Sequence, residues 1–206
     1  QLGEGTAVEP EEIAVMMLRL QAEGCHNINF VSPSHVVAPI LAATLIAAQA
    51  GLRVPLVYNT GGYDSLEALA LLDGVIDIYM PDMKYADAAT ARRYSKIRDY
   101  PTINRAAVKE MHRQVGDLQV DEWGVAGRGL LVRHLVLPEG IAGSEAVFDF
   151  LAREVSRETY VSLMSQYFPA HLAAAQPGVD RRRGAPHRPV AAQVPRPRDD
   201  GPRAEP

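Results

Sequence analysis

The spacing of apolar residues along the chain alternates between a helical period and short strand-like runs. Ile13, Met16, Met17 and Leu20 recur at helical spacing after an acidic first turn, and Gly24 follows them, which predicts a helix over 10–23. Asp64 precedes another such run and is predicted to cap its amino end. The same criteria predict further helices over 36–50, 65–72, 86–94, 102–115 and 145–155, and strands over 27–31, 54–58, 75–80, 130–137 and 159–164.

The alternation of strands and helices at this spacing predicts an α/β fold with about five parallel strands and flanking helices. Residues 118–129 interrupt the alternation with a predicted hairpin excursion before the fourth strand. Both a barrel-like and a flat doubly wound sheet fit the pattern. No glycine-rich phosphate loop follows any predicted strand, so the pattern favours a barrel or partial barrel.

The composition changes after residue 174. Residues 175–206 contain seven Arg, seven Pro, four acidic residues and no aromatic residue, and such a segment cannot bury enough apolar surface to offset its ordering entropy. We therefore predict a folded unit over 1–174 and a disordered tail over 175–206. The run Arg181–Arg183 is interpreted as solvated disorder, with weak binding to an acidic surface or nucleic acid as the alternative.

Overall composition restricts the classes of partner and cofactor. The 206 residues are 47 % hydrophobic with a formal net charge of −4, which fits a folded protein and argues against specific nucleic-acid binding. No apolar stretch is long enough to span a membrane, and no signal-like segment begins the chain, so a cytoplasmic location and no membrane partner are expected. One cysteine excludes an intrachain disulfide and any site that needs several thiolates from this chain.

Polar residues follow the predicted strands at their carboxyl ends, where ligand sites of parallel α/β folds collect. Asp82 and Lys84 are two positions apart and therefore point to the same side of an extended backbone, where together they could hold a zwitterion. A structural ion pair is the alternative for them, and a glycine-containing turn is the alternative for residues 59–62. The candidate residues at the strand ends are Ser32, Ser34, Asn59, Thr60, Gly61, Asp82, Lys84, Arg133, Gln166 and Tyr167.

Other residues with chemical potential are interpreted mainly as structural. Arg133 and His134 are neighbours in a predicted strand and must face opposite sides, so at most one of them points into a barrel. His35 is a candidate base or ligand, with a role at a helix entry favoured. Cys25 is predicted to be a small buried residue, and Trp123 to be a packing cap on the hairpin.

Several long sequence blocks within residues 1–172 resemble those of a known protein family and occur in the same order. The chain resembles an uncharacterised iron–sulfur branch of the radical S-adenosylmethionine (SAM) proteins that is related to pyruvate formate-lyase activating enzymes. The resemblance is carried by GCHNINFVSPSHVVAPIL (24–41), PLVYNTGGYDSLEALALLDGVIDIYMPDMKY (55–85), MHRQVGDL (111–118), GLLVRHLVLPEG (129–140) and YVSLMSQYFPA (160–170).

The resemblance implies a partial (β/α)6 barrel and a [4Fe–4S] cluster held by a CxxxCxxC loop. In the family, the reduced cluster cleaves SAM to give a 5′-deoxyadenosyl radical; an electron donor such as flavodoxin and, in activating enzymes, a protein substrate are the implied partners. The three-cysteine loop follows the family's first strand, and this sequence contains neither. The chain is therefore expected to be truncated at its N-terminus, to lack the first strand and the metal ligands, and to be inactive alone.

The resemblance also assigns positions around SAM. Ser32 and Ser34 stand where the family has a glycine-glycine-glutamate loop that meets the amino group of the methionine moiety, and this motif is altered in the present sequence. Asp82 and Lys84 match an Asp-Leu-Lys segment that contacts SAM in the family. The remaining positions implied to lie near SAM are Asn59, Thr60 and Gly61 beside the cofactor, Arg133 facing the site, and Gln166 or Tyr167 near the adenosyl portion.

Two other functions are consistent with the same residues. One is a non-catalytic module that keeps affinity for SAM or for a protein surface. The other is a barrel lyase that forms a Schiff base through Lys84, because burial can lower the pKa of a lysine enough to give the uncharged, nucleophilic amine.

Overall fold

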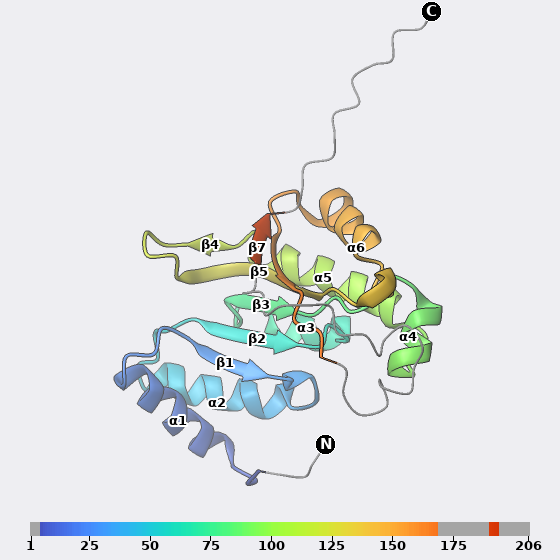
Figure 1. The fold of residues 1–206 in the computed structure, drawn as a ribbon. Helices are drawn as coiled ribbons and strands as arrows, with labels where there is room; N and C mark the ends of the chain where they lie inside the picture. Colours follow the sequence, from blue (N-terminus) through green and yellow to red (C-terminus); the bar gives the residue numbers. More distant parts are fainter. Residues whose placement is uncertain (1–4, 169–189, 194–206) are drawn as a thin grey trace, which may run out of the picture.

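The computed structural model describes residues 5–168 and 190–193, and in these residues the strands form one mostly parallel sheet. The strand order is β1-β2-β3-β5-β6-β7, with β4 paired to β5. Neighbours from β1 to β6 along this path are parallel (Figure 1). The parallel strands are β1 (Ile28–Val31), β2 (Leu56–Thr60), β3 (Ile78–Pro81), β5 (Ala126–Leu135) and β6 (Tyr160–Met164), which confirms the predicted α/β class.

Two short antiparallel strands extend this sheet. β4 (Gln119–Val120) pairs with β5 and forms the predicted hairpin excursion. Trp123 lies at its turn with 79 % of its surface exposed, so its prediction as a packing cap is wrong. β7 (Val190–Gln193) pairs with β6 and lies inside the segment predicted to be a disordered tail. The other residues of that segment, including Arg181–Arg183, lie outside the described residues.

Helices connect the parallel strands close to their predicted positions. Contrary to the sequence prediction, Asp64 does not cap α3 (Leu66–Leu72). The Ser65 hydroxyl accepts the backbone N–H of Ala68 at 3.1 Å instead, and Asp64 is buried. Within the described ranges, no helix combines the length and apolar character needed to cross a membrane. The helices are α1 (Pro10–Ala22), α2 (Val37–Gln49), α3 (Leu66–Leu72), α4 (Ala88–Ser95), α5 (Tyr100–Val115) and α6 (Ser144–Phe150), the last continued by a π-helical turn over Leu151–Val155.

The hydrophobic core lies on one face of the sheet. Alternate strand residues point to opposite faces, and the strand residues in the core cluster all belong to one of these two sets. They pack against buried residues of the helices, as Tyr58 does edge-to-face against Tyr79 with ring centroids 5.7 Å apart. The core-facing strand residues are Ile28, Leu56, Tyr58, Tyr79, Leu130, Val132 and Val161. The opposite face carries the buried apolar residues Val57 and Ile78 and, toward the carboxyl ends of the strands, the polar residues Asn59 and Arg133.

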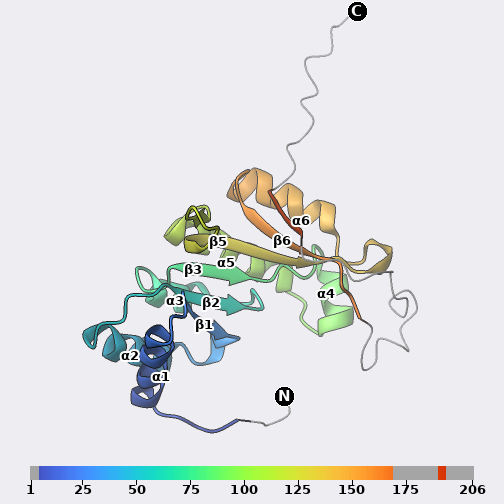
Figure 2. The same cartoon turned by 60° about the vertical axis from the view of Figure 1, so that its left-hand side comes forward.

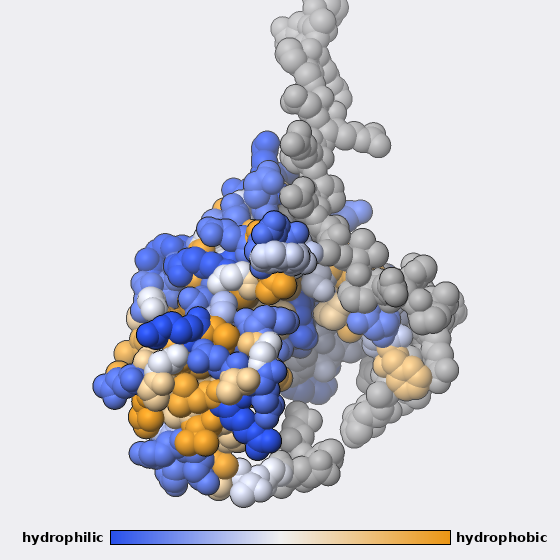
Figure 3. Space-filling view, turned by 90° about the vertical axis from the view of Figure 1, so that its left-hand side faces the viewer, coloured by the Kyte–Doolittle hydropathy of each residue, from blue (hydrophilic) through white to orange (hydrophobic). Residues whose placement is uncertain are grey.

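The helix layer itself keeps apolar side chains at its surface. Val15 of α1 is 65 % exposed and Leu45 of α2 is 60 % exposed. Figure 3 shows apolar side chains gathered on the lower part of one side of the molecule, and Figure 2 shows α1 and α2 at the bottom of the fold.

Candidate functional site

Asp82 is the centre of an ion-pair cluster at the carboxyl ends of the strands. Its Oδ1 accepts the Nε–H of Arg133 at 2.9 Å, and its Oδ2 accepts Lys84 Nζ at 2.7 Å. Arg133 also donates from Nη1 to Asn59 Oδ1 at 3.4 Å. One carboxylate with two cations leaves the cluster with one net positive charge.

Strand pairing brings these residues together. Asp82 directly follows β3, Arg133 lies on β5, and the two residues form a parallel bridge. The Asp82 N–H donates to the Thr60 carbonyl at 2.9 Å, and the Met83 N–H donates to the Arg133 carbonyl at 2.9 Å. Because Asp82 and Lys84 alternate with buried Met83, both point away from the core, as their two-residue spacing predicts.

A hollow of about 570 Å³ adjoins the ion-pair cluster. This volume lies within the range of roughly 300–1,000 Å³ that is usual for small-molecule sites. Its charged groups come from the cluster, Ser95 and Gln166 add uncharged polar groups, and the rest of its wall is aliphatic or aromatic. The lining residues are Asp82, Met83, Lys84, Tyr85, Ser95, Arg133, Leu135, Leu137, Met164, Gln166 and Tyr167, which include five of the ten candidate residues.

Two side chains of α5 hold the strand-end loops in place. The buried Tyr100 hydroxyl lies 2.9 Å from the Gly61 carbonyl and 3.0 Å from the Asp82 carbonyl, and it accepts the Lys84 N–H at 3.1 Å. Burial raises the pKa of Tyr100 well above its usual value, so the phenol keeps the proton that it donates. Asn104 Nδ2 donates to the carbonyls of Gly62 and Asp82, at 2.9 Å each. The sequence analysis missed both residues.

Ser34 and Thr60 belong to a different cluster, around the buried carboxylate of Asp64. Ser34 donates to Asp64 Oδ1 at 2.6 Å, Tyr58 donates to the same oxygen at 3.0 Å, and Thr60 donates to Oδ2 at 2.7 Å. Burial and the nearby Asp64 carboxylate raise the pKa of Tyr58, which keeps its hydroxyl a donor. This cluster holds the β2–α3 loop from the core side. Ser34 and Thr60 therefore stabilise that loop and do not line the hollow.

The remaining candidate residues lie near the strand ends without lining the hollow. Ser32 is exposed with a left-handed backbone, φ 54°, and its N–H continues the β1–β2 ladder by donating to the Asn59 carbonyl. Gly61 presents its carbonyl to Tyr100. His35 is exposed in the 3₁₀ turn Pro33–His35, which leads into α2, in agreement with its interpretation as a helix-entry residue.

His134 faces the core, opposite to Arg133, as the strand alternation requires. Its Nδ1 lies 2.6 Å from the Met83 carbonyl, which can only accept a hydrogen bond, so Nδ1 carries the proton. Nε2 then accepts the Ser144 hydroxyl at 2.8 Å. Burial lowers the pKa of His134, because the charged imidazolium loses its hydration there.

This burial predicts a loss of stability in acid. The unfolded chain binds a proton at His134 near pH 6.5, whereas the native imidazole binds it only at lower pH, so the free energy of unfolding decreases as pH falls below about 6.5. The slope contributed by this residue is at most about 1.4 kcal/mol per pH unit. Urea unfolding at pH 7.5 and 5.5 should show a larger loss for the native sequence than for His134→Gln. Equal losses in the two proteins would contradict the prediction.

The donor set of this chain does not fit a [4Fe–4S] cluster. The sequence contains one cysteine, Cys25. The sequence pattern predicts it to be buried, but the structure shows it only partly buried. Cys25 precedes β1, and its neighbour His26 lines a separate hollow with Pro55 and Arg128 at the amino ends of the strands, away from Asp82. No group of three or more His, Cys, Asp or Glu residues suited to a metal ion occurs in the part of the chain that the structure describes.

The fold and site together define an α/β protein with a mostly parallel sheet and a charged hollow at the carboxyl ends of its strands. No protein-family model matches the chain. It is 28 % identical over 174 residues to a protein of Methanocaldococcus jannaschii named "Uncharacterized protein MJ0674". The match covers 84 % of this chain and 46 % of that relative, so the chain spans about half the length of the protein it matches.

Proposed function

We propose that the hollow beside Asp82 binds S-adenosylmethionine, in a partial barrel of the radical SAM type. The observation that carries this proposal is the Arg133–Asp82–Lys84 cluster at the edge of a hollow with a largely apolar wall. SAM combines an amino-acid zwitterion with an adenosyl group, and the two parts of the site match these two parts of the ligand.

The ion-pair cluster provides complementary charges for the amino-acid end. Arg133 uses Nε and Nη1 in its contacts with Asp82 and Asn59, which leaves the N–H groups of Nη2 to meet a ligand carboxylate. Asp82 and the side-chain oxygen of Asn59 are acceptors for a ligand ammonium group. The side chain of Asp82 is 15 % exposed, so charge-assisted hydrogen bonds form there with limited competition from water.

The wall of the hollow provides surface for the nucleoside end. Leu135, Leu137 and Met164 supply aliphatic contacts, and Tyr85 and Tyr167 supply aromatic rings. Tyr85 is held at its hydroxyl by Ser95 at 3.1 Å and packs edge-to-face on Tyr100 with centroids 5.9 Å apart. A fixed aromatic ring loses little entropy when it contacts a flat base.

The distribution of the core supports the barrel arrangement. Helix side chains pack on one face of the sheet, and the charged residues of the hollow project from the other. In a barrel the helices form the outer layer and the polar site opens at the carboxyl ends of the strands. A flat doubly wound sheet would instead have helices packed on both faces.

The proposal for this chain is limited to binding. Because its residues do not fit a [4Fe–4S] cluster, no reductive cleavage of SAM is assigned to it. A protein substrate and an electron donor such as flavodoxin belong to cluster-bearing members of the resembled family and stay predictions, as does a cytoplasmic location. For Lys84, the ion pair with Asp82 and a side chain that is 45 % exposed favour a binding ammonium over a Schiff-base nucleophile.

Calorimetric titration of SAM into the full chain tests the proposal. Arg133→Gln should weaken SAM binding at least about tenfold, since a hydrogen bond to a charged group contributes about 1.5–3 kcal/mol. Arg128→Gln is the matched control, because Arg128 lies on the same strand but lines the hollow at the amino ends. The affinity of the Arg128→Gln variant for SAM should stay within about twofold of the native value, as expected for a surface substitution away from the ligand.

A second ligand shows which part of SAM the cluster contacts. 5′-Methylthioadenosine has the adenosyl group but no amino-acid moiety, so Arg133→Gln should leave its affinity unchanged. Absence of SAM binding by a folded native chain would contradict the proposal. Equal weakening by Arg133→Gln and Arg128→Gln would also contradict it.

A further inference from the structure

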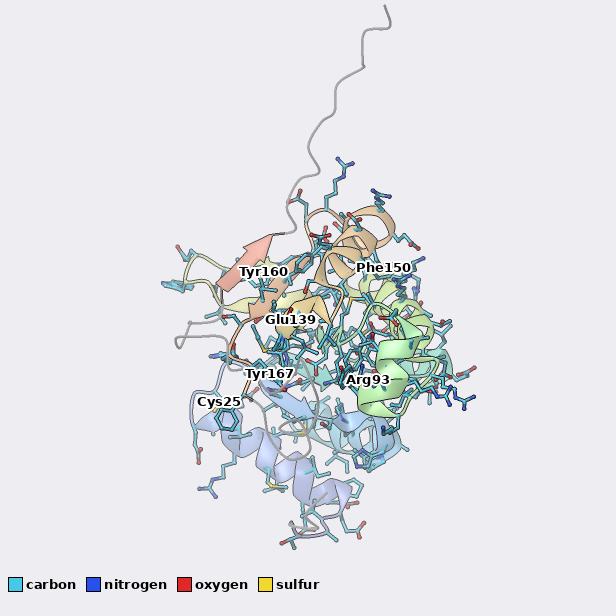
Figure 4. The ribbon with its side chains drawn as sticks, turned by 45° about the vertical axis from the view of Figure 1, so that its right-hand side comes forward. Cys25, Arg93, Glu139, Phe150, Tyr160 and Tyr167 are labelled. Carbon is cyan, nitrogen blue, oxygen red and sulfur yellow. The ribbon has the colours of Figure 1, made fainter. Side chains whose placement is uncertain are left out.

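A second hollow, of about 510 Å³, lies on α4 and is lined by positively charged side chains. Ala89, Arg92, Arg93 and Lys96 follow helical spacing on one face of α4, and Arg98 follows in the turn after it. We call this hollow, with its four cations Arg92, Arg93, Lys96 and Arg98, the α4 basic hollow. Figure 4 labels Arg93 on α4, at the right of the molecule, and Tyr167, which lines the hollow beside Asp82, nearer the centre.

No acidic side chain of the described residues lines the α4 basic hollow. Among residues 5–168, no carboxylate forms an ion pair with any of its four cations, whereas Arg19 and Lys109 each form one and Arg113 forms two. The acids that flank it in sequence have other partners: Asp87 accepts from Thr90 at the start of α4, and Asp99 accepts the Tyr63 hydroxyl at 2.9 Å. Four exposed positive charges that form no ion pair among residues 5–168 therefore line one shallow concavity, in a chain whose net charge is −4.

Two of these cations are held in place by contacts within the protein. Lys96 ends α4 with a left-handed backbone, φ 62°, and its Nζ donates to the Arg93 carbonyl at 3.0 Å. The Arg93 guanidinium lies over the Tyr94 ring, 5.1 Å from its centroid. Side chains that are already ordered lose less entropy when a ligand binds.

We infer that the α4 basic hollow is a binding site for an oligophosphate group, such as the phosphate chain of a nucleotide. An oligophosphate carries several negative charges within a few ångströms, and arginine guanidinium groups match phosphate oxygens in a bidentate arrangement. A concave site lined by three arginines and a lysine concentrates complementary charge on such a compact group. This inference does not depend on the proposed SAM site, because the two hollows share no lining residue.

Calorimetric titration of the full chain with inorganic triphosphate and with a nucleoside triphosphate tests this site. The double variant Arg92→Gln/Arg93→Gln should weaken binding of both probes at least about tenfold. The control Arg153→Gln/Arg157→Gln removes two exposed arginines elsewhere and should change affinity less than about twofold. Raising the salt concentration should weaken native binding, because exposed charges are screened. Equal affinities for the two probes identify the phosphate chain as the ligand, and tighter nucleotide binding shows a base contact in addition.

Lys96→Gly separates loss of charge from loss of folding. Glycine adopts a positive φ without strain, so this variant should be at least as stable as the native chain while it weakens triphosphate binding about threefold or more. Unchanged binding in the arginine double variant, or no binding of either probe at low salt, would overturn the inference. Tighter binding of an acidic peptide such as oligoglutamate than of triphosphate would overturn it in favour of a protein partner.

Discussion

Replacing Gly62 by alanine is expected to lower the free energy of unfolding by about 2–4 kcal/mol. A Cβ at this position would lie 2.2 Å from the Asp82 carbonyl oxygen and 2.3 Å from Asn104 Nδ2, and Gly62 has φ +75°. Backbone and a clamping side chain must both move to make room, at a site where an L side chain is already strained. Urea unfolding followed by circular dichroism measures the change.

The neighbouring glycine provides the matched control. A Cβ on Gly61 would meet only Lys84 Cε, at 3.9 Å, which is ordinary van der Waals contact at the end of a flexible side chain. Gly61→Ala should therefore change stability by less than about 1 kcal/mol. If Gly62→Ala were as stable as Gly61→Ala, the close approach of the β2–α3 loop to Asp82 and Asn104 would be wrong.

Asp64→Ala is expected to have a comparable or larger effect, about 3–5 kcal/mol. The substitution removes the acceptor of three hydroxyl groups, those of Ser34, Tyr58 and Thr60, and Tyr58 is fully buried. Buried donors that lose their partner pay the full cost of desolvation, and the cavity left by the carboxylate adds to it. Thermal unfolding monitored by calorimetry, together with urea unfolding, measures the loss.

Two further substitutions show whether the number of hydroxyl partners decides the size of this effect. Asp64→Asn keeps one acceptor oxygen and should be less destabilising than Asp64→Ala. Asp87→Ala removes an exposed helix cap that accepts hydrogen bonds from Thr90, and it should cost about 1 kcal/mol. A cost of Asp64→Ala no greater than that of Asp87→Ala would show that the buried cluster does not stabilise the β2–α3 loop.

The parallel sheet could be predicted because each strand carries a recognisable apolar pattern between polar segments. The boundaries were less accurate where a polar residue belongs to the strand. The second strand was expected over 54–58 but runs from Leu56 to Thr60, since Thr60 faces the core and directs its hydroxyl to Asp64. β7 was missed because its residues lie in a segment whose composition indicates disorder, and its pairing with β6 is a long-range contact.

The ion-pair cluster could be predicted in part from local spacing. Asp82 and Lys84 are two residues apart at a strand end, and the opposite orientations of Arg133 and His134 follow from strand alternation. Tyr100 was not predicted, because its partners are main-chain groups of residues 61, 82 and 84, which no sequence pattern marks. Asn104 did leave a signal, since it is a polar residue in line with the buried Val108 and Met111 of α5.

The alternation of Arg133 and His134 also has a consequence for how the chain folds. A shift of β5 by one residue against β3 and β6 would turn the guanidinium into the apolar layer and move the imidazole away from Met83 and Ser144. Such a misaligned intermediate would bury an unpaired cation, so it is energetically penalised and tends to unpair again. The two adjacent side chains thus favour the native register of β5 against its neighbouring strands during folding, whatever ligand the folded protein binds.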